Sequence, residues 1–218
     1  MPSTLEFVGG LGVVASQSMN ILTIPSVLKI AQAKSTLSFP SFPLMIALTS
    51  AIHNIIYALV TWNMFVVLSS SITFTFNVIF LLVHYRYSRS RSAMRRELLL
   101  YPVLTVAISF FGVRYFSFNC ASLGCLQSSR VWLGAVSTVI SCVCYCGQLS
   151  TFRTIMRQRD ASSISPWLTA GVAFRGLVWN TYAILLGDWF NFTSSAVGIL
   201  SAIIQVVFLL KYHALKND

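Results

Sequence analysis

The chain consists of long apolar runs that alternate with short polar or charged segments. Seven such runs cover residues 7–28, 42–62, 65–85, 98–117, 131–152, 166–187 and 190–211. Each run has the length of about 20 residues that an α-helix needs to cross a hydrocarbon core of about 30 Å. Lipid offers no hydrogen-bond partner to a backbone N–H or C=O, so a spanning segment of this kind has to be helical. The pattern therefore predicts an all-α membrane protein with seven transmembrane helices.

Composition excludes an ordinary soluble protein. Hydrophobic residues make up 56% of the 218 residues and charged residues 9%, against roughly a quarter charged in a soluble domain. The net charge of +10 does not indicate nucleic-acid binding, because the basic residues form no continuous patch and instead mark the ends of apolar runs. The first run has no basic residue ahead of it and no cleavage pattern of small residues, so we expect a retained helix rather than a signal peptide.

The basic residues predict the orientation of the chain in the membrane. Twelve of them fall on one side of the predicted bilayer: Lys29, Lys34, Arg86, Arg89, Arg91, Arg95, Arg96, Arg153, Arg157, Arg159, Lys211 and Lys216. The other side has only Arg114 and Arg130. Because Lys and Arg are enriched in cytosolic loops, we expect an extracellular or lumenal N-terminus and a cytosolic C-terminus. The plasma membrane is the expected location, with an internal membrane as the alternative.

An internal repeat becomes visible at an offset of 125 residues. Residues 27–35 align without a gap with residues 152–160, and the same offset pairs Asn54 with Trp179, Tyr57 with Tyr182, Ala58 with Ala183 and Ser70 with Ser195. Transporter folds are often built from such duplicated units. We therefore predict two parallel three-helix bundles joined by a linker helix. The expected domains are a first bundle over residues 1–88, the linker helix and its flanking loops over 89–128, and a second bundle over 129–218.

Four segments resemble one family of membrane proteins. The segment PSVLKIAQAKST (25–36) resembles the PQ-loop signature of the SWEET and SemiSWEET sugar transporters. The segments TFRTIMRQRDASSIS (151–165), VWNTYAILLGDWF (178–190) and SSAVGILSAIIQ (194–205) are similar to later parts of eukaryotic SWEETs, in the same order. The resemblance covers nearly the whole chain. It implies facilitative, bidirectional transport (uniport) of mono- or disaccharide sugars by alternating access.

The resemblance also implies a set of substrate-binding residues. The two residues that sandwich the sugar in the family fall on Asn54 and Trp179, and the family's pair of pocket asparagines falls on Ser70 and Ser195. Further pocket positions fall on Ser16, Met19, Ser141 and Tyr145. Of the family's four hinge prolines, Pro43 is in its place, Pro25 and Pro166 lie two residues and one residue past theirs, and the fourth position holds Gln148. These departures indicate a divergent member.

Polar residues inside the apolar runs point to a similar site without the family. Such residues are costly in lipid and are therefore candidates for function; near mid-span lie Ser16, Asn20, His53, Asn54, Ser141, Arg175, Trp179 and Asn180. Arg175 and Trp179 stand four residues apart and share one helix face. Hydroxyls, amides and one indole would suit a neutral polyol. Each of the serines has packing between helices as its alternative role, and Trp179 has anchoring at the membrane interface.

Arg175 is the residue that fits a neutral sugar least well. A guanidinium stays charged in a protein, so within the membrane it needs carbonyls, water or an anion. One interpretation has Arg175 bonded to neighbouring carbonyls, and a second makes it an anion site for a sugar acid, a sugar phosphate or a carboxylate. A third has the side chain reaching toward the interface. The sequence leaves these three interpretations open.

Two other functions stay open beside sugar transport. One is a PQ-loop carrier of an anionic or amino-acid solute that Arg175 would bind. The other is a receptor on the same helix plan, such as the KDEL receptor, which a single intramembrane Arg argues against. The runs contain no nucleophile–base pair, paired carboxylates or metal-ligand spacing, so we predict no enzyme activity, no cofactor and no metal.

Proton coupling is not expected, because all five acids fall at or beyond span ends: Glu6, Glu97, Asp160, Asp188 and Asp218. The expected partners are a small sugar and the lipid bilayer. Self-assembly into a homo-oligomer is left open. So is the pairing of Cys120 with Cys125, which flank one loop.

Overall fold

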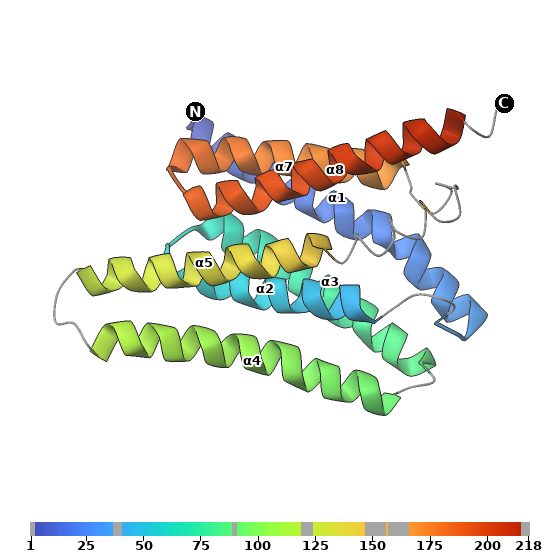
Figure 1. Ribbon diagram of the computed structural model, residues 1–218, viewed down its shortest axis with the longest axis horizontal. Helices are drawn as coiled ribbons and strands as arrows, with labels where there is room; N and C mark the ends of the chain where they lie inside the picture. Colours follow the sequence, from blue (N-terminus) through green and yellow to red (C-terminus); the bar gives the residue numbers. More distant parts are fainter. Residues whose placement is uncertain are drawn as a thin grey trace. The chain divides into compact units, whose positions relative to one another are not determined.

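The computed structural model describes residues 3–36, 41–88, 91–118, 124–146, 156 and 166–214. Over these ranges it contains seven long helices and no strand (Figure 1): α1 (Thr4–Ala33), α2 (Phe42–Val60), α3 (Met64–Tyr87), α4 (Arg91–Phe118), α5 (Gly124–Cys146), α7 (Pro166–Leu186) and α8 (Trp189–Ala214). The prediction of an all-α protein with seven helices is confirmed. The largest deviations are the starts of α4 and α5, at 91 instead of 98 and at 124 instead of 131. Both helices extend beyond the apolar run into polar sequence.

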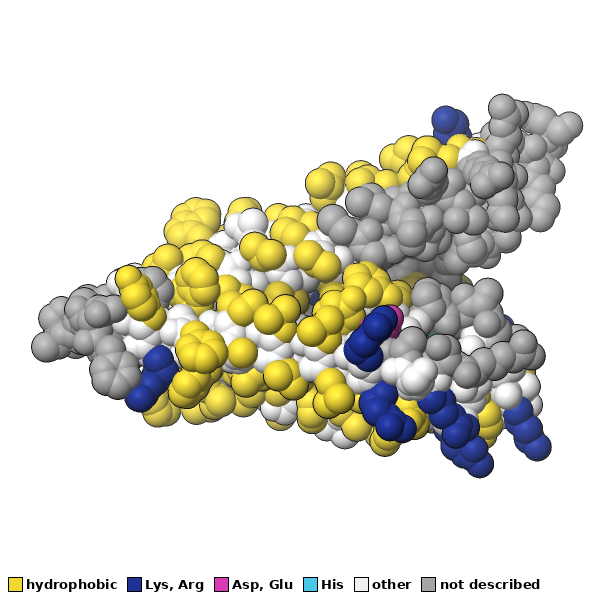
Figure 2. Space-filling model, turned by 60° about the horizontal axis from the view of Figure 1, so that its bottom comes forward, with side chains coloured by type: hydrophobic (Ala, Val, Ile, Leu, Met, Phe, Trp, Pro, Cys, Tyr) yellow, Lys and Arg dark blue, Asp and Glu magenta, His cyan; other side chains and the backbone are white. Residues whose placement is uncertain are grey.

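The outer faces of the helices are apolar. Large hydrophobic side chains stand exposed along the described helices, among them Phe7, Leu82, Phe111 and Leu210. Figure 2 shows hydrophobic side chains over much of one face of the molecule, with most of the visible Lys and Arg side chains toward the right of the view. Monomeric soluble proteins rarely expose apolar surface of this extent. This surface is suited to contact with lipid.

Not every helix is equally apolar. Within the described ranges, five helices are long and apolar enough to cross a membrane: α1, α2, α3, Met94–Tyr115 of α4 and Trp189–Tyr212 of α8. The other two, α5 and α7, are not among these five; α5 carries Arg130, and α7 carries both Arg175 and Asn180. Polar groups in spanning helices face other helices rather than lipid. The intramembrane polar residues of α7, Arg175 and Asn180, are therefore candidates for function.

By its contacts the chain divides into two compact units. Unit 1 contains Met1–Leu22 and Ser141–Asp218, and unit 2 contains Thr23–Ile140. The first part of α1 thus groups with α7 and α8, while most of α5 groups with α2, α3 and α4. In terms of the repeat, the first helix of each copy groups with the second and third helices of the other copy. The expected domain boundaries at 88 and 128 follow the sequence repeat and stay a prediction.

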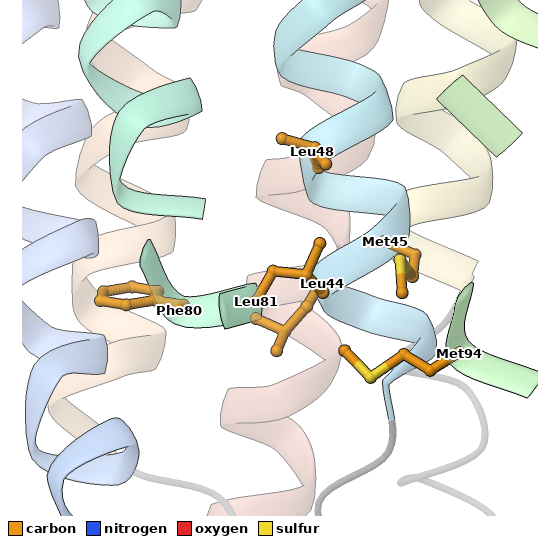
Figure 3. Packing of buried hydrophobic residues seen from close by; sticks show 6 residues of the cluster. All are labelled: Leu44, Met45, Leu48, Phe80, Leu81 and Met94. Atoms are coloured by element: carbon orange, nitrogen blue, oxygen red, sulfur yellow. The ribbon is translucent and has the colours of Figure 1, made fainter. Parts of the chain in front are cut away.

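The core of unit 2 forms where α2 packs against α3 and α4. Leu44, Met45 and Leu48 share one face of α2 because they stand one and four residues apart. They meet Phe80 and Leu81 of α3 and Met94 of α4 (Figure 3). At the same end the Ser41 hydroxyl donates to Oε2 of Glu97 at 3.2 Å. This bond fixes the start of α2 to α4.

A tight turn joins α2 to α3. The amide of Asn63 donates to the Ala58 carbonyl at 2.9 Å, and the amide of Trp62 donates to the Leu59 carbonyl at 3.3 Å. This pair of bonds is the Schellman arrangement, which places one residue in the left-handed region. That residue is Trp62, with φ of 56°. The side chain of Asn63 then caps α3 by accepting from the Val66 amide at 3.3 Å.

The same turn recurs 125 residues later between α7 and α8. The amide of Asp188 donates to the Ala183 carbonyl at 2.9 Å, and the amide of Gly187, with φ of 70°, donates to the Ile184 carbonyl at 3.2 Å. Oδ1 of Asp188 accepts from the Asn191 amide at 3.1 Å, as the side chain of Asn63 does in the first copy. Each position of the second turn has its counterpart 125 residues earlier. The shared hydrogen bonds support the repeat that the sequence alignment predicts.

In unit 1, α7 packs along α8 in the opposite direction (Figure 1). The Thr169 hydroxyl near the start of α7 donates to Oε1 of Gln205 in the second half of α8 at 2.8 Å. Farther along α7, a Cβ on Gly176 would lie 2.6 Å from a side-chain atom of Ile199. Absence of a side chain at Gly176 therefore permits the close approach of the two helices.

Candidate functional site

A cluster of three predicted site residues lies within unit 1. The indole N–H of Trp179 donates to the Ser16 hydroxyl oxygen at 2.8 Å. Nε of Arg175 donates to the same oxygen at 3.2 Å. Ser16 is 3% exposed and Trp179 is 8% exposed. The structure thus brings together one residue of α1 and two of α7, which we call the Ser16 cluster.

Helical spacing on both helices explains how the cluster forms. Arg175 and Trp179 are four residues apart on α7, so their side chains lie on one face. Gly12 and Ser16 are spaced in the same way on α1. A Cβ on Gly12 would lie 3.1 Å from the Trp179 ring. The missing side chain at Gly12 makes room for the indole beside the hydroxyl that binds it.

Met19 continues the same face of α1. Its sulfur would lie 2.6 Å from a Cβ on Gly171 of α7. Residue 12 of α1 therefore meets residue 179 of α7, and residue 19 meets residue 171. The two helices consequently run in opposite directions. Because α8 also opposes α7, α1 and α8 are parallel within unit 1.

The indole of Trp179 is held from a second side by Tyr182. The two rings meet edge to face, with centroids 5.4 Å apart and planes at 90°. Aromatic pairs favour this geometry. With its N–H bound to Ser16 and its ring against Tyr182, Trp179 has a fixed orientation. A fixed indole is a suitable surface for a flat apolar face of a ligand.

Arg175 has one side-chain bond within the described part of the chain, and its partner is the Ser16 hydroxyl. The described acids are engaged elsewhere. Glu6 accepts from the Ser3 amide, Glu97 accepts from Ser41, and Asp188 caps α8. The guanidinium therefore has no carboxylate partner among the described residues.

Asn54 lies in unit 2 and is bonded to α5. Its Oδ1 accepts from the Ser137 hydroxyl at 2.8 Å. The next residue back, His53, is fully buried and places Nε2 at 3.0 Å from the Leu133 carbonyl oxygen. Since Leu133 and Ser137 stand four apart on α5, two adjacent residues of α2 bond to one face of that helix.

His53 also ties α2 to α4. Its Nδ1 lies 2.9 Å from the Ser109 hydroxyl, which is itself 2.8 Å from the Thr105 carbonyl oxygen. Nε2 has to be the donor toward Leu133, because a carbonyl oxygen only accepts. Nδ1 of a neutral ring is then an acceptor for the single Ser109 proton, in competition with the Thr105 carbonyl oxygen. His53 therefore links α2 to α4 and α5 through its two ring nitrogens.

The other predicted binding residues occupy separate positions. In unit 2, Ser70 is 8% exposed. In unit 1, Ser141 is 9% exposed, and the Ser195 hydroxyl donates to the Asn191 carbonyl of its own helix at 2.8 Å. The Tyr145 hydroxyl would lie 2.6 Å from a Cβ on Gly198, so α5 meets α8 there. The structure thus joins Ser16, Arg175 and Trp179 directly. That all nine residues contact one substrate stays a prediction.

The three predicted hinge prolines differ in their effect on the backbone. Pro43 lies in the first turn of α2 and Pro166 is the first residue of α7. A proline in the first turn interrupts no ladder bond, because that N–H has no partner inside the helix. Pro25 lies inside α1, where it removes the bond to the Ile21 carbonyl. Of the three, only Pro25 weakens its own helix.

Sequence reasoning missed several buried polar partners. Ser137, Ser109 and the Thr169–Gln205 pair make side-chain bonds between helices, and Asn77 of α3 is 6% exposed. Each is a polar residue inside an apolar run. Asn77 and Gln205 could have been found by that signal, since amides are rare there. Serine and threonine are too common in membrane helices to stand out.

Some predictions fall outside the described residues. These are the similarity of residues 151–165, the position of Gln148, and the pairing of Cys120 with Cys125, whose side chain is not described. Cys142 and Cys144 are free thiols. Among the described residues, no group of three or more His, Cys, Asp or Glu could hold a metal ion.

Comparisons with known proteins bear on the family. Residues 131–217 match a family model described as "Sugar efflux transporter for intercellular exchange". Bidirectional sugar transporter SWEET12 of Oryza sativa subsp. japonica is 27% identical over 215 residues, covering 97% of this chain and 69% of the relative. Bidirectional sugar transporter SWEET5 of Arabidopsis thaliana is 24% identical over 218 residues, covering 96% and 87%.

A solved structure shares the fold. The 3.7 Å structure of a eukaryotic SWEET transporter matches with a TM-score of 0.81 at 18% identity, covering 96% of this chain and 97% of the other. The likeness extends over all seven helices.

Proposed function

Because the chain is a divergent member of the SWEET family, we propose that it transports mono- or disaccharide sugars in both directions across a membrane. The relatives that match over nearly the whole chain are named bidirectional sugar transporters. The transport is facilitative: it follows the gradient of the sugar. Alternating access, in which the site opens to one side at a time, is part of the proposal.

The orientation of Trp179 is the observation that carries this proposal. A sugar ring has apolar C–H faces and a polar rim, so an aromatic face beside hydrogen-bonding groups binds it well. Trp179 is buried, and its indole N–H is already bonded to Ser16. The ring therefore needs no reordering when a ligand arrives. Such preorganisation increases affinity, since less freedom is lost on binding.

In unit 2, Asn54 has a polar group of its own for a sugar. Its carbonyl oxygen is occupied by the Ser137 hydroxyl. The amide nitrogen has no bond to another described residue, so it is available to donate to a sugar hydroxyl. Asn54 and Trp179 stand at corresponding positions of the two repeat copies, and each is oriented by a serine of a neighbouring helix.

Uniport agrees with the positions of the ionisable groups. A proton-coupled transporter needs a titratable group within the membrane. The described acids lie at helix ends, and both ring nitrogens of His53 are bonded to its neighbours. Pro25, inside α1, is the best candidate for a flexible point during transport.

Purified protein in liposomes tests the proposal. Labelled glucose, fructose and sucrose are offered, and uptake is followed until it stops. We expect equal concentrations inside and outside, and faster exchange when unlabelled sugar is preloaded. Accumulation of sugar above its external concentration would rule out uniport, and no uptake of any of the three would rule out sugar transport.

A pair of tryptophan variants links transport to the site. Trp179→Ala should abolish uptake because it removes the stacking surface. Trp189→Ala is the matched control, since Trp189 is 73% exposed at the start of α8. It should leave uptake unchanged. Equal uptake by both variants would contradict the role of Trp179.

The location and orientation complete the proposal. We place the N-terminus outside the cytosol and the C-terminus inside it, in the plasma membrane. The parallel course of α1 and α8 agrees with ends on opposite faces. Assembly into a homo-oligomer stays open.

A further inference from the structure

Arg175 is the one residue of the Ser16 cluster that neutral sugar transport does not require. It lies in the middle of α7, nine residues after Pro166 and eleven before Leu186. A guanidinium at such a depth is costly unless it is paired. Within the described residues its bond goes to a neutral hydroxyl, not to a carboxylate or a backbone carbonyl. The charge therefore has no counter-ion from this part of the chain.

The hydrogen bonds of the cluster leave only donors available. The Ser16 oxygen has two lone pairs, and the N–H groups of Trp179 and Arg175 occupy them. The hydroxyl proton of Ser16 and the two Nη groups of Arg175 remain, and all of these donate. A neutral sugar hydroxyl both donates and accepts, so it would leave its own proton unpaired here. A carboxylate only accepts, and it fits a guanidinium in a two-bond arrangement.

The positive charge of Arg175 occurs in only one of the two repeat copies. The counterpart of Arg175 in the first copy is Ser50, 125 residues earlier. A structural need common to both copies would not call for a cation in one and a hydroxyl in the other. Arg175, beside Trp179, thus differs from its counterpart Ser50 by a positive charge, which favours anion binding.

From these observations we propose that the substrates of this transporter include sugar acids, whose carboxylate binds to Arg175 and Ser16 while the ring stacks on Trp179. This inference rests on the proposed transport function and specifies its substrate class. A carboxylate on a pyranose ring places the anion at the edge of the sugar. Arg175 and Trp179 lie on one helix face, so both parts of the ligand are met by one side of α7.

Transport of a sugar acid has a consequence that neutral sugar transport lacks. Each uronate carries one negative charge across the membrane. The energy of that charge in a membrane potential is about 2.3 kcal/mol per 100 mV. A potential of about 60 mV, positive inside, should therefore support about tenfold accumulation of the acid. A neutral sugar should not respond.

The experiment uses the full chain in liposomes with a potassium diffusion potential. Labelled D-glucuronate and labelled D-glucose are offered separately, with glucose 6-phosphate as a third solute. We expect glucuronate uptake that follows the potential, competition between glucuronate and glucose, and little uptake of the phosphate. Uptake of glucose without glucuronate would overturn this inference and leave the proposed function intact. Uptake of the phosphate but not of glucuronate would also overturn it, and uptake of none of the three would overturn both.

Arginine variants assign the effect to this side chain. Arg175→Gln should reduce glucuronate uptake by about ten- to a hundredfold, the loss expected for hydrogen bonds to a charged group. An unchanged melting temperature in detergent micelles should report that the variant is folded, and glucuronate uptake should fall more than glucose uptake. Arg175→Lys should restore part of the glucuronate uptake, because it keeps the charge without the two-bond geometry.

The matched control is Arg114→Gln, which removes an arginine near the end of α4. It should leave both solutes unaffected. Equal loss of glucose and glucuronate uptake in Arg175→Gln would indicate a structural role and contradict the inference, provided that Arg175→Lys shows the same equal loss.

Discussion

The bond between Ser16 and Trp179 supports the orientation of the indole, and its contribution can be measured. Ser16→Ala removes the acceptor of two N–H groups, one from Trp179 at 2.8 Å and one from Arg175 at 3.2 Å. Ser16 is 3% exposed, so water does not readily replace the lost partner. Leaving buried donors unsatisfied costs about 1–3 kcal/mol. We expect a loss of stability in this range.

A double-mutant cycle separates this bond from other effects of the substitution. Trp179→Phe removes the indole N–H and keeps an aromatic ring, and Ser16→Ala removes the acceptor. Measured couplings of side-chain bonds between membrane helices average about 0.6 kcal/mol and reach about 1.7. We expect a coupling energy within these bounds, measured as the free energy of unfolding in mixed micelles. The control cycle combines Trp179→Phe with Ser195→Ala, because Ser195 bonds within its own helix.

Transport provides the second readout of the same variants. Release of the indole from Ser16 should raise KM for the sugar, since Trp179 must then be ordered on binding. The maximal rate should change less. Counterflow in liposomes measures both quantities. Additive stabilities in the Ser16–Trp179 cycle, together with an unchanged KM in Ser16→Ala, would refute the view that this bond orients the indole.

Three further predictions concern packing, the turns and orientation. Gly112→Ala should destabilise the chain by about 1–3 kcal/mol, the usual cost of overpacking, because the new Cβ would overlap the indole ring of Trp132. Thermal unfolding checks this, with Gly10→Ala as the control because nothing lies within 4 Å of a Cβ there. Gly187→Ala should lower the free energy of unfolding by about 1 kcal/mol, because a left-handed φ of 70° is unfavourable for a residue with a Cβ. Trp62→Gly at the corresponding turn should relieve backbone strain, and a fall in its melting temperature would contradict this explanation of the two turns. In a chain without native cysteines, an impermeant thiol reagent should label Ser3→Cys in intact cells and Ser88→Cys only after permeabilisation; labelling of both in intact cells would refute the orientation.

The positions of the helices were predictable because each apolar run is a local property of the sequence. The starts of α2, α3, α7 and α8 fall within one residue of the expected positions. The starts of α4 and α5 were wrong by seven residues, since a helix that leaves the membrane continues without an apolar signal. Hydropathy reports where lipid ends and not where helical hydrogen bonding ends.

The site was predictable in part. That Arg175 and Trp179 share a face follows from their spacing of four. That Ser16 binds both could not be predicted from the residues alone, because the bond joins positions 163 residues apart. It depends on how α1 approaches α7, which Gly12 and Gly171 permit. Ser137, the partner of Asn54, was missed for the same reason.

The two copies of the repeat have kept their backbone and changed their side chains. The turns after α2 and α7 share their hydrogen bonds at an offset of 125, although Trp62 stands where the second copy has Gly187. At the site, by contrast, Asn54 corresponds to Trp179 and Ser50 to Arg175. Many sequences can form this turn, so both copies keep its backbone although their residues differ. A ligand such as a sugar acid has different groups at its two edges, so it favours a different set of side chains from each copy. Most positions differ between the two copies, and the differences at Asn54/Trp179 and Ser50/Arg175 agree with the proposed asymmetric substrate in a duplicated frame.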